Sequence, residues 1–130
     1  MIVIMAEKPS VARDIARVLG VRGSGDGCIS GNGYTITWAL GHLVTQCEPD
    51  EIDENMKKWR MDTLPFLPET IPNKVIPASK KQYQIVKKLF LSKETEKIIC
   101  ATDAGREGEL IFRRIYHLSG CRKQIGRAHV

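Results

Sequence analysis

The sequence of 130 residues has no hydrophobic run long enough to cross a membrane. Its longest apolar stretches, Met1–Ala6 and Ile98–Ala101, are far shorter than the roughly 20 residues that a membrane-spanning helix needs. Met1–Ala6 also lacks the basic region and the small-residue cleavage site of a signal peptide. These absences predict a cytoplasmic protein.

The cysteines are widely spaced and form no metal-binding or redox motif. The sequence contains no CxxC pair, which excludes a zinc ribbon and a thioredoxin-like site. We therefore expect four free thiols, of which Cys100, inside an apolar run, lies in the core. The cysteines are Cys28, Cys47, Cys100 and Cys121.

Lysine and arginine outnumber acidic residues by 20 to 15, which gives a formal net charge of +5. This excess favours a polyanionic partner such as nucleic acid. The charge is uneven, because 48–54 is acidic whereas 57–60, 80–81 and 87–88 are basic. A solvated surface explains each basic cluster equally well.

The hydrophobic pattern predicts an α/β fold. Met1–Met5 has the composition of a buried strand, and helical spacing of apolar residues then continues to Leu19 and ends at Gly20. A second strand is expected at Lys97–Ala101, followed by a helix over residues 106–118. Right-handed crossovers place the two strands parallel in one sheet, with helices on its faces.

Between these units the sequence predicts a hairpin. The segment Gly23–Gly33 contains five glycines, but no buried strand precedes its Gly23-Ser24-Gly25 fragment and no helix follows it, as a nucleotide-binding loop would require. A hairpin is favoured instead, with strands at 28–30 and 34–40 joined at Asn32-Gly33.

Residues 41–77 contain five prolines and little periodicity, which predicts a long connection on the surface. Such connections are more often functional than accidental. A helix capped by Ser79 should follow and continue to about Leu91. Four apolar side chains of the connection are expected to pack against the core: Trp59, Leu64, Phe66 and Leu67.

Three carboxylates are predicted to meet at one edge of the sheet. Glu7 and Asp103 each follow a predicted strand by two residues, and ligands of α/β sheets bind where parallel strands end. Glu107 lies in the first turn of the next helix, where the helix dipole favours negative charge. Each acid alone could be a first-turn residue or a helix cap. Together they favour a site for Mg²⁺, which prefers oxygen ligands.

The residues around these acids resemble a known family. Glu7-Lys8-Pro9-Ser10, the block from Ala101 to Ile111 (ATDAGREGELI) and the segment Thr37–Leu43 (TWALGHL) are similar to the Toprim module of type IA DNA topoisomerases, nearest to the topoisomerase III group. The Trp59 region agrees, and the resemblance covers about residues 1–123. It implies a Toprim-type, Rossmann-like sheet with a hairpin and long-loop insertion.

The resemblance also implies a reaction. Such enzymes cut one DNA strand through a tyrosine, pass another strand and reseal the break, with Mg²⁺ beside the scissile phosphate of single-stranded DNA. Glu7 would act on the proton of the 3′-hydroxyl, and Glu7, Asp103 and Glu107 would hold the metal. Lys8 would contact the phosphate, and Arg106 would neutralise backbone charge.

Two departures from the family pattern bear on activity. Gly105 occupies the position of the second Asp in the usual DxDxE array, which predicts weaker metal binding. The attacking tyrosine belongs to a later domain of the family, and Tyr34, Tyr83 and Tyr116 match no nucleophile motif. The chain alone is therefore expected not to relax DNA and to need the downstream domains of the same protein.

Two other functions are also compatible with these residues. One is another Toprim phosphoryl-transfer enzyme, a nuclease or a primase. The other is a non-catalytic nucleic-acid-binding domain, with Gly105 as a trace of lost chemistry. Lys8-Pro9-Ser10 and Gly41-His42-Leu43 favour the topoisomerase.

Residues 124–130 (QIGRAHV) continue no pattern. Back-translated as CAG-ATC-GGA-AGA-GCA-CAC-GTC, they resemble the start of a common sequencing adapter. We therefore expect a Toprim domain at 1–123 and a non-native tail at 124–130, with a native polar tail as the alternative. The genomic sequence beyond codon 123 distinguishes the two.

Overall fold

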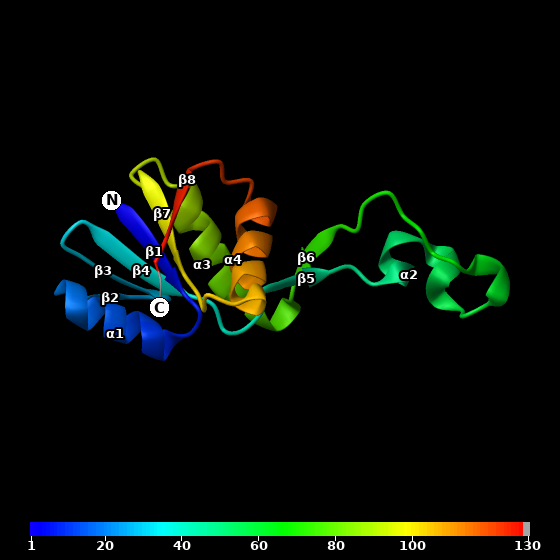
Figure 1. Ribbon diagram of the computed structural model, residues 1–130, viewed down its shortest axis with the longest axis horizontal. Coiled ribbons are helices and arrows are strands. Elements are labelled where there is room, and N and C mark those ends of the chain that lie inside the picture. The colour runs from blue at the N-terminus through cyan, green and yellow to red at the C-terminus, as the bar shows by residue number, and fades with distance from the viewer. Residues whose placement is uncertain (129–130) are drawn as a thin grey trace.

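A computed structural model describes residues 1–128 and shows an α/β body from which a narrow arm projects (Figure 1). The main sheet has the strand order β2-β3-β4-β1-β7-β8, in which β4, β1, β7 and β8 run parallel. The predicted mainly parallel sheet is confirmed. Its strands are β1 (Ile2–Ala6), β2 (Gly23–Gly25), β3 (Cys28–Gly31), β4 (Tyr34–Trp38), β7 (Lys97–Ala101) and β8 (Gln124–Arg127).

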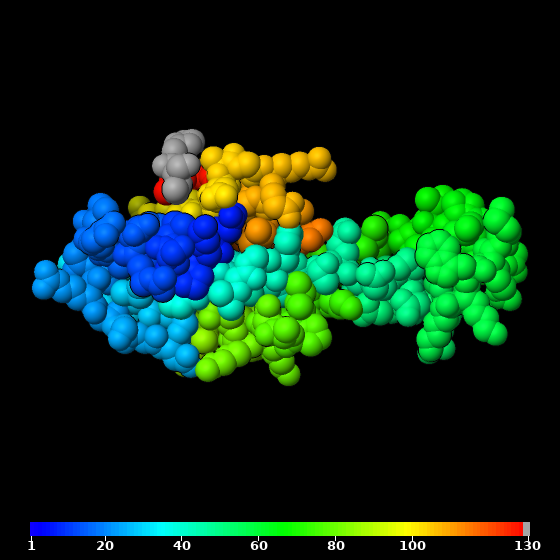
Figure 2. All heavy atoms as spheres, turned by 90° about the horizontal axis from the view of Figure 1, so that it is seen from below, coloured from blue at the N-terminus to red at the C-terminus, as the bar shows by residue number. Residues whose placement is uncertain are grey.

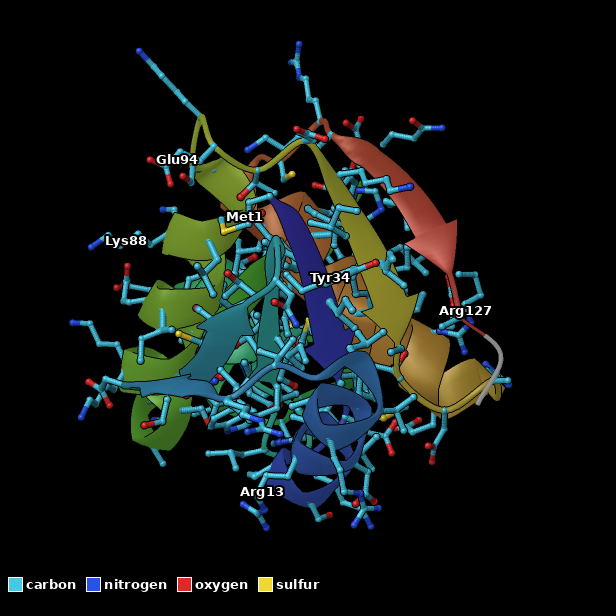
Figure 3. The ribbon with its side chains drawn as sticks, turned by 90° about the vertical axis from the view of Figure 1, so that its left-hand side faces the viewer. Met1, Arg13, Tyr34, Lys88, Glu94 and Arg127 are labelled. Atoms are coloured by element: carbon cyan, nitrogen blue, oxygen red, sulfur yellow. The ribbon has the colours of Figure 1, made fainter. Side chains whose placement is uncertain are left out.

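Helices cover both faces of this sheet. Helix α1 (Pro9–Leu19) lies on one face, and α3 (Lys80–Leu91) and α4 (Arg106–Ser119) lie on the other (Figure 3). Successive residues of β1 point to opposite faces, so the strand contributes to both hydrophobic cores. Val3 and Met5 pack with α3 and α4, whereas Ile4 and Ala6 pack with α1.

Local sequence explains how the first helix begins and ends. Pro9 occupies its first turn, where a missing N–H costs nothing. Gly20 adopts a left-handed conformation with φ 69°, and the next N–H, of Val21, donates to the carbonyl of Ala16 at 2.8 Å. The predicted end at Gly20 is confirmed. At α3 the expected cap is only partly confirmed, because Ser79 precedes the helix but its hydroxyl makes no capping hydrogen bond.

The predicted hairpin is also present. Strands β3 and β4 pair antiparallel, and Asn32 (φ 52°) and Gly33 (φ 80°) form the turn with the positive φ angles that a two-residue hairpin loop needs. The Asn32 side-chain amide donates to the Gly20 carbonyl at 2.9 Å, which ties the turn to the end of α1. The sequence did not predict the short strand β2 that pairs with β3.

The connection after β4 forms a separate projection. Strands β5 (Val44–Gln46) and β6 (Asn73–Val75) pair antiparallel as a stalk, and we call the residues between them, 47–72, the arm and the remaining residues the body. The arm contains α2 (Pro49–Ile52) and two 3-10 turns, η1 (Glu54–Lys57) and η2 (Met61–Thr63). A third turn, η3 (Pro77–Ser79), leads back into α3.

The expectation that the arm packs against the core is wrong. Trp59 and Leu67 are 88% and 82% exposed, and Leu64 is exposed as well. Phe66 is half-buried, but it faces hollows lined by other arm residues and by the stalk. The stalk explains this outcome, because its two strands direct the arm away from the body (Figure 2).

Residues 124–127 form β8, an edge strand parallel to β7 that the sequence pattern did not predict. The proposed boundary at residue 123 and the non-native origin of the tail stay predictions, and the last two tail residues, 129–130, lie outside the described residues. All four cysteines are free, and Cys100 is buried as expected. Within residues 1–128, no helix is long and apolar enough to span a bilayer.

Helix α4 approaches the end of β7 so closely that only glycine fits at position 108. A Cβ atom at Gly108 would lie 2.2 Å from the Asp103 carbonyl oxygen. We predict that Gly108→Ala lowers the free energy of unfolding by about 1–3 kcal/mol, because backbone must shift to admit the methyl group. Urea denaturation followed by circular dichroism measures this change. Gly105→Ser is the matched variant, because its new Cβ would have no atom within 4 Å beyond those of its chain neighbours. Its free energy of unfolding should stay within about 0.5 kcal/mol of the wild type. Equal losses in both variants would show that the close approach at Gly108 is not the cause.

Candidate functional site

Glu7 and Asp103 meet where β1 and β7 end. The two strands are parallel neighbours in a register that sets Ala6 opposite Ala101, so the residues that follow them leave the sheet at the same edge. The backbone N–H of Asp103 donates to Glu7 Oε1 at 3.4 Å, across 96 positions of sequence. The structure thus brings together the first two of the three predicted acids.

The contact between these acids changes the ionisation of Glu7. Burial of its carboxyl group is the largest cause that raises the pKa of Glu7 above the ordinary 4.5, and the neighbouring Asp103 carboxyl raises it further. The Asp103 backbone N–H and the charge of Lys8 oppose the shift. Because two like charges repel, such a pair favours a bound proton or cation between the carboxylates.

Glu107 lies in the first turn of α4, as predicted, but its carboxylate contacts His42 instead of the other two acids. Among residues 1–128, no three His, Cys, Asp or Glu side chains are close enough together to hold a metal ion. In the structure the Glu7 and Asp103 side chains therefore lie together, whereas the exposed Glu107 side chain contacts His42.

His42 also lies at this edge, and the sequence did not predict it as a site residue. Its Nε2 contacts Glu107, and its buried Nδ1 has no hydrogen-bond partner among the described residues. A signal was available, since His42 follows β4, which lies parallel beside β1 with Trp38 opposite Ala6. Loops after three adjacent parallel strands thus supply the side chains of one edge.

The two cations predicted to contact DNA also lie at this edge. Lys8 immediately precedes α1, and Arg106 is the first residue of α4; both are exposed. Neither forms an ion pair with another part of residues 1–128, so each can meet an external anion. Arg106 lines a surface hollow of about 460 Å³ together with Arg113 and Arg114.

Other residues of the motif have structural partners. Glu109 pairs with Arg113 at 2.9 Å and with Arg127 at 3.4 Å, which fits a scaffolding role. Tyr116 stacks on Phe112 and donates its hydroxyl hydrogen to the Lys123 carbonyl at 2.8 Å. Its hydroxyl is therefore engaged within the body, and its ring packs against the core on the face that α3 and α4 cover.

Comparison with known proteins identifies the family. The family model described as the Toprim domain matches residues 2–130. The chain is 47% identical over 124 residues to DNA topoisomerase 3 of Shouchella clausii and 48% identical over 124 residues to that of Staphylococcus aureus (strain USA300). It is 50% identical over 125 residues to DNA topoisomerase 3 of Bacillus thuringiensis. These alignments cover 95–96% of the chain but 17% of each relative.

The chain belongs to the Toprim domain family. Its α/β body, with the acids at the carboxyl ends of β1 and β7, agrees with the fold that the sequence predicted. The chain spans about one sixth of the length of the topoisomerases that it matches.

The contact of Glu7 with Asp103 yields a prediction about protonation. Asp103→Asn should return the pKa of Glu7 toward 4.5, because the substitution removes the repelling charge, as carbon-13 NMR titration of the Glu7 carboxyl group would show. Since the folded-state pKa is raised, Glu7 stabilises the fold most below its unfolded pKa, and this contribution is lost as pH rises through the folded pKa.

Glu107→Gln is the matched control and should leave the Glu7 titration unchanged, since Glu107 contacts His42. A Glu7 pKa that is indifferent to Asp103→Asn, or that responds equally to both substitutions, would show that the two carboxyl groups do not interact as described.

Proposed function

We propose that this chain is the metal-binding Toprim module of a type IA DNA topoisomerase of the topoisomerase III kind. The parent enzyme would cut one DNA strand, pass another strand through the break and reseal it. The observation that supports this proposal most is the apposition of Glu7 and Asp103 at the carboxyl edge of the sheet, in a chain nearly half identical to proteins named DNA topoisomerase 3.

The acids at this edge suit Mg²⁺ as a cofactor. Glu7 and Asp103 offer hard oxygen ligands. A cation between them would offset the partial burial and the neighbouring Asp103 carboxyl, which together raise the pKa of Glu7. Glu107 could join them by a side-chain rotation away from His42, with water and a substrate phosphate as further ligands. Bound there, Mg²⁺ would neutralise charge that develops on the phosphate during strand cleavage.

The same edge is arranged to bind the backbone of single-stranded DNA. Helices α1 and α4 both begin here, and the N-terminus of a helix attracts anions through its dipole and free N–H groups. Lys8 and Arg106 add positive charge at these two helix starts. A phosphate placed between them would lie beside the Glu7 and Asp103 carboxylates.

Glu7 is the proposed proton-transfer group. A carboxyl group with a raised pKa binds a proton more readily than an ordinary glutamate, which suits a residue that gives a proton to a leaving 3′-oxygen and takes it back during resealing. Lys8, next in sequence, would hold the phosphate in position. The attacking tyrosine would come from a downstream domain of the same protein.

Gly105 bears on a second candidate, a non-catalytic DNA-binding module. The residue stands before α4 with open space around its α-carbon, so an aspartate would fit, and its absence leaves one carboxylate fewer at the edge. We propose weakened metal binding rather than lost activity, because Glu7 and Asp103 are both retained.

Calorimetry tests the metal site. Mg²⁺ titrated into the protein should bind more weakly to Glu7→Gln and Asp103→Asn, and about tenfold more tightly to Gly105→Asp, because a further carboxylate adds roughly 1.4 kcal/mol of attraction. Glu109→Gln is the matched control and should change nothing, since Glu109 pairs with Arg113 and Arg127. Equal affinities in all four variants would remove the metal site from this edge.

Plasmid relaxation tests the reaction. The full-length protein should relax negatively supercoiled plasmid when Mg²⁺ is present and stop when it is chelated. Glu7→Gln should slow relaxation by about 100-fold or more, the usual effect of losing a proton-transfer group. Plasmid that is cut but never resealed would identify a nuclease instead, and DNA binding without cutting by the wild type would identify a non-catalytic module.

A further inference from the structure

The arm, residues 47–72, exposes an unusual share of apolar surface. None of its residues is buried. Five of the eight large hydrophobic side chains that are exposed within residues 1–128 belong to it: Trp59, Met61, Leu64, Leu67 and Ile71. A group of exposed apolar side chains on one projection is more often an interaction site than ordinary solvated surface.

The arm has a defined conformation. Glu48 and Glu51 form a reciprocal capping pair at the start of α2, in which the Glu48 N–H donates to Glu51 Oε1 at 3.0 Å. Lys74 on the stalk reaches the same carboxylate at 2.5 Å, and the Cys47 N–H donates to the Pro72 carbonyl at 2.9 Å. A surface held in this way can be complementary to a partner before binding, which lowers the entropic cost of association.

The arm and the body have opposite charges. The arm contains seven acidic and three basic residues, a net charge of −4, whereas the rest of the chain contains 8 acidic and 17 basic residues, a net charge of +9. The arm's three basic residues, Lys57, Lys58 and Arg60, surround Trp59, and such a cluster alone would suit stacking of single-stranded DNA. The acidic excess opposes this use, because it repels phosphates.

The shape of the arm points to a protein partner. Ile52 and Phe66 line two hollows, of about 550 Å³ and 320 Å³, that flank the inner part of the arm. Met61 and Leu67 are 87% and 82% exposed. Exposed apolar side chains near hollows of mixed polar and apolar lining are typical of protein interfaces, which combine a hydrophobic centre with a charged rim.

We propose that the arm is a docking surface for another domain of the same polypeptide, one with a basic surface and apolar side chains that enter the hollows. This inference rests on the proposed function, under which the chain is one module of a protein about six times longer. A domain tethered to the body is present at high effective concentration, so a small interface such as the arm is sufficient for stable docking.

Hydrogen–deuterium exchange on the full-length protein tests the proposal. Amides of residues 66–71, for which no hydrogen bond within residues 1–128 is found, should exchange at least about tenfold more slowly than free peptide rates, because docking excludes water from the arm. The double substitution Met61→Glu and Leu67→Glu should abolish this protection while body amides stay protected, since both side chains are exposed and contribute nothing to the core. The matched control Lys58→Ala should leave the arm protected.

Three results would overturn the proposal. Arm amides that exchange at free peptide rates in the wild type would show that nothing docks. Protection that appears only with added oligothymidylate and is lost in Lys58→Ala would identify DNA as the occupant. Protection that falls on dilution would identify a second copy of the protein.

Relaxation of plasmid by the same preparations separates this inference from the proposed function. Relaxation with an unprotected arm would refute docking alone. A protected arm in a protein that does not relax DNA would refute the proposed function alone, and the docking surface would stand.

Discussion

The parallel pairing of β1 with β7 is the constraint on which the candidate site depends. Both strands are central in the sheet and are covered by helices, so hydrophobic burial on both faces fixes their register. A slip of one residue would turn every side chain of one strand to the opposite face. The register that buries the core therefore also determines that Glu7 and Asp103 leave the sheet together.

The site opposes the stability of the fold that positions it. Partial burial of the Glu7 carboxyl and the neighbouring Asp103 carboxyl both disfavour its ionised form, and the pKa of Glu7 is raised as a result. The sheet and the buried approach of α4 at Gly108 hold the backbone in place despite the repulsion. A bound cation would relieve this repulsion, because it would place a positive charge beside both carboxylates.

Much of the body could be predicted because its signals are local. The apolar runs of β1 and β7, the helical spacing of α1 and the Asn32-Gly33 turn each specify structure within a few residues, and the rule for parallel strands then places the acids. Prediction failed where no local pattern marked the arrangement. His42 meets Glu107 because it follows β4, whose parallel pairing with β1 the sequence did not predict. Apolar identity alone likewise did not show that the arm points away from the core.

The charge of the chain is divided between the body, which holds the candidate site, and the arm. A uniform distribution of the net charge of +5 would favour no part of the surface for DNA binding. The charge is instead divided, with +9 on the body and −4 on the arm. The arm would therefore repel a polyanion that the body attracts. An acidic arm would also complement the basic surface of the partner domain that we propose. The same separation of charge would thus guide a nucleic acid to the body and the partner domain to the arm.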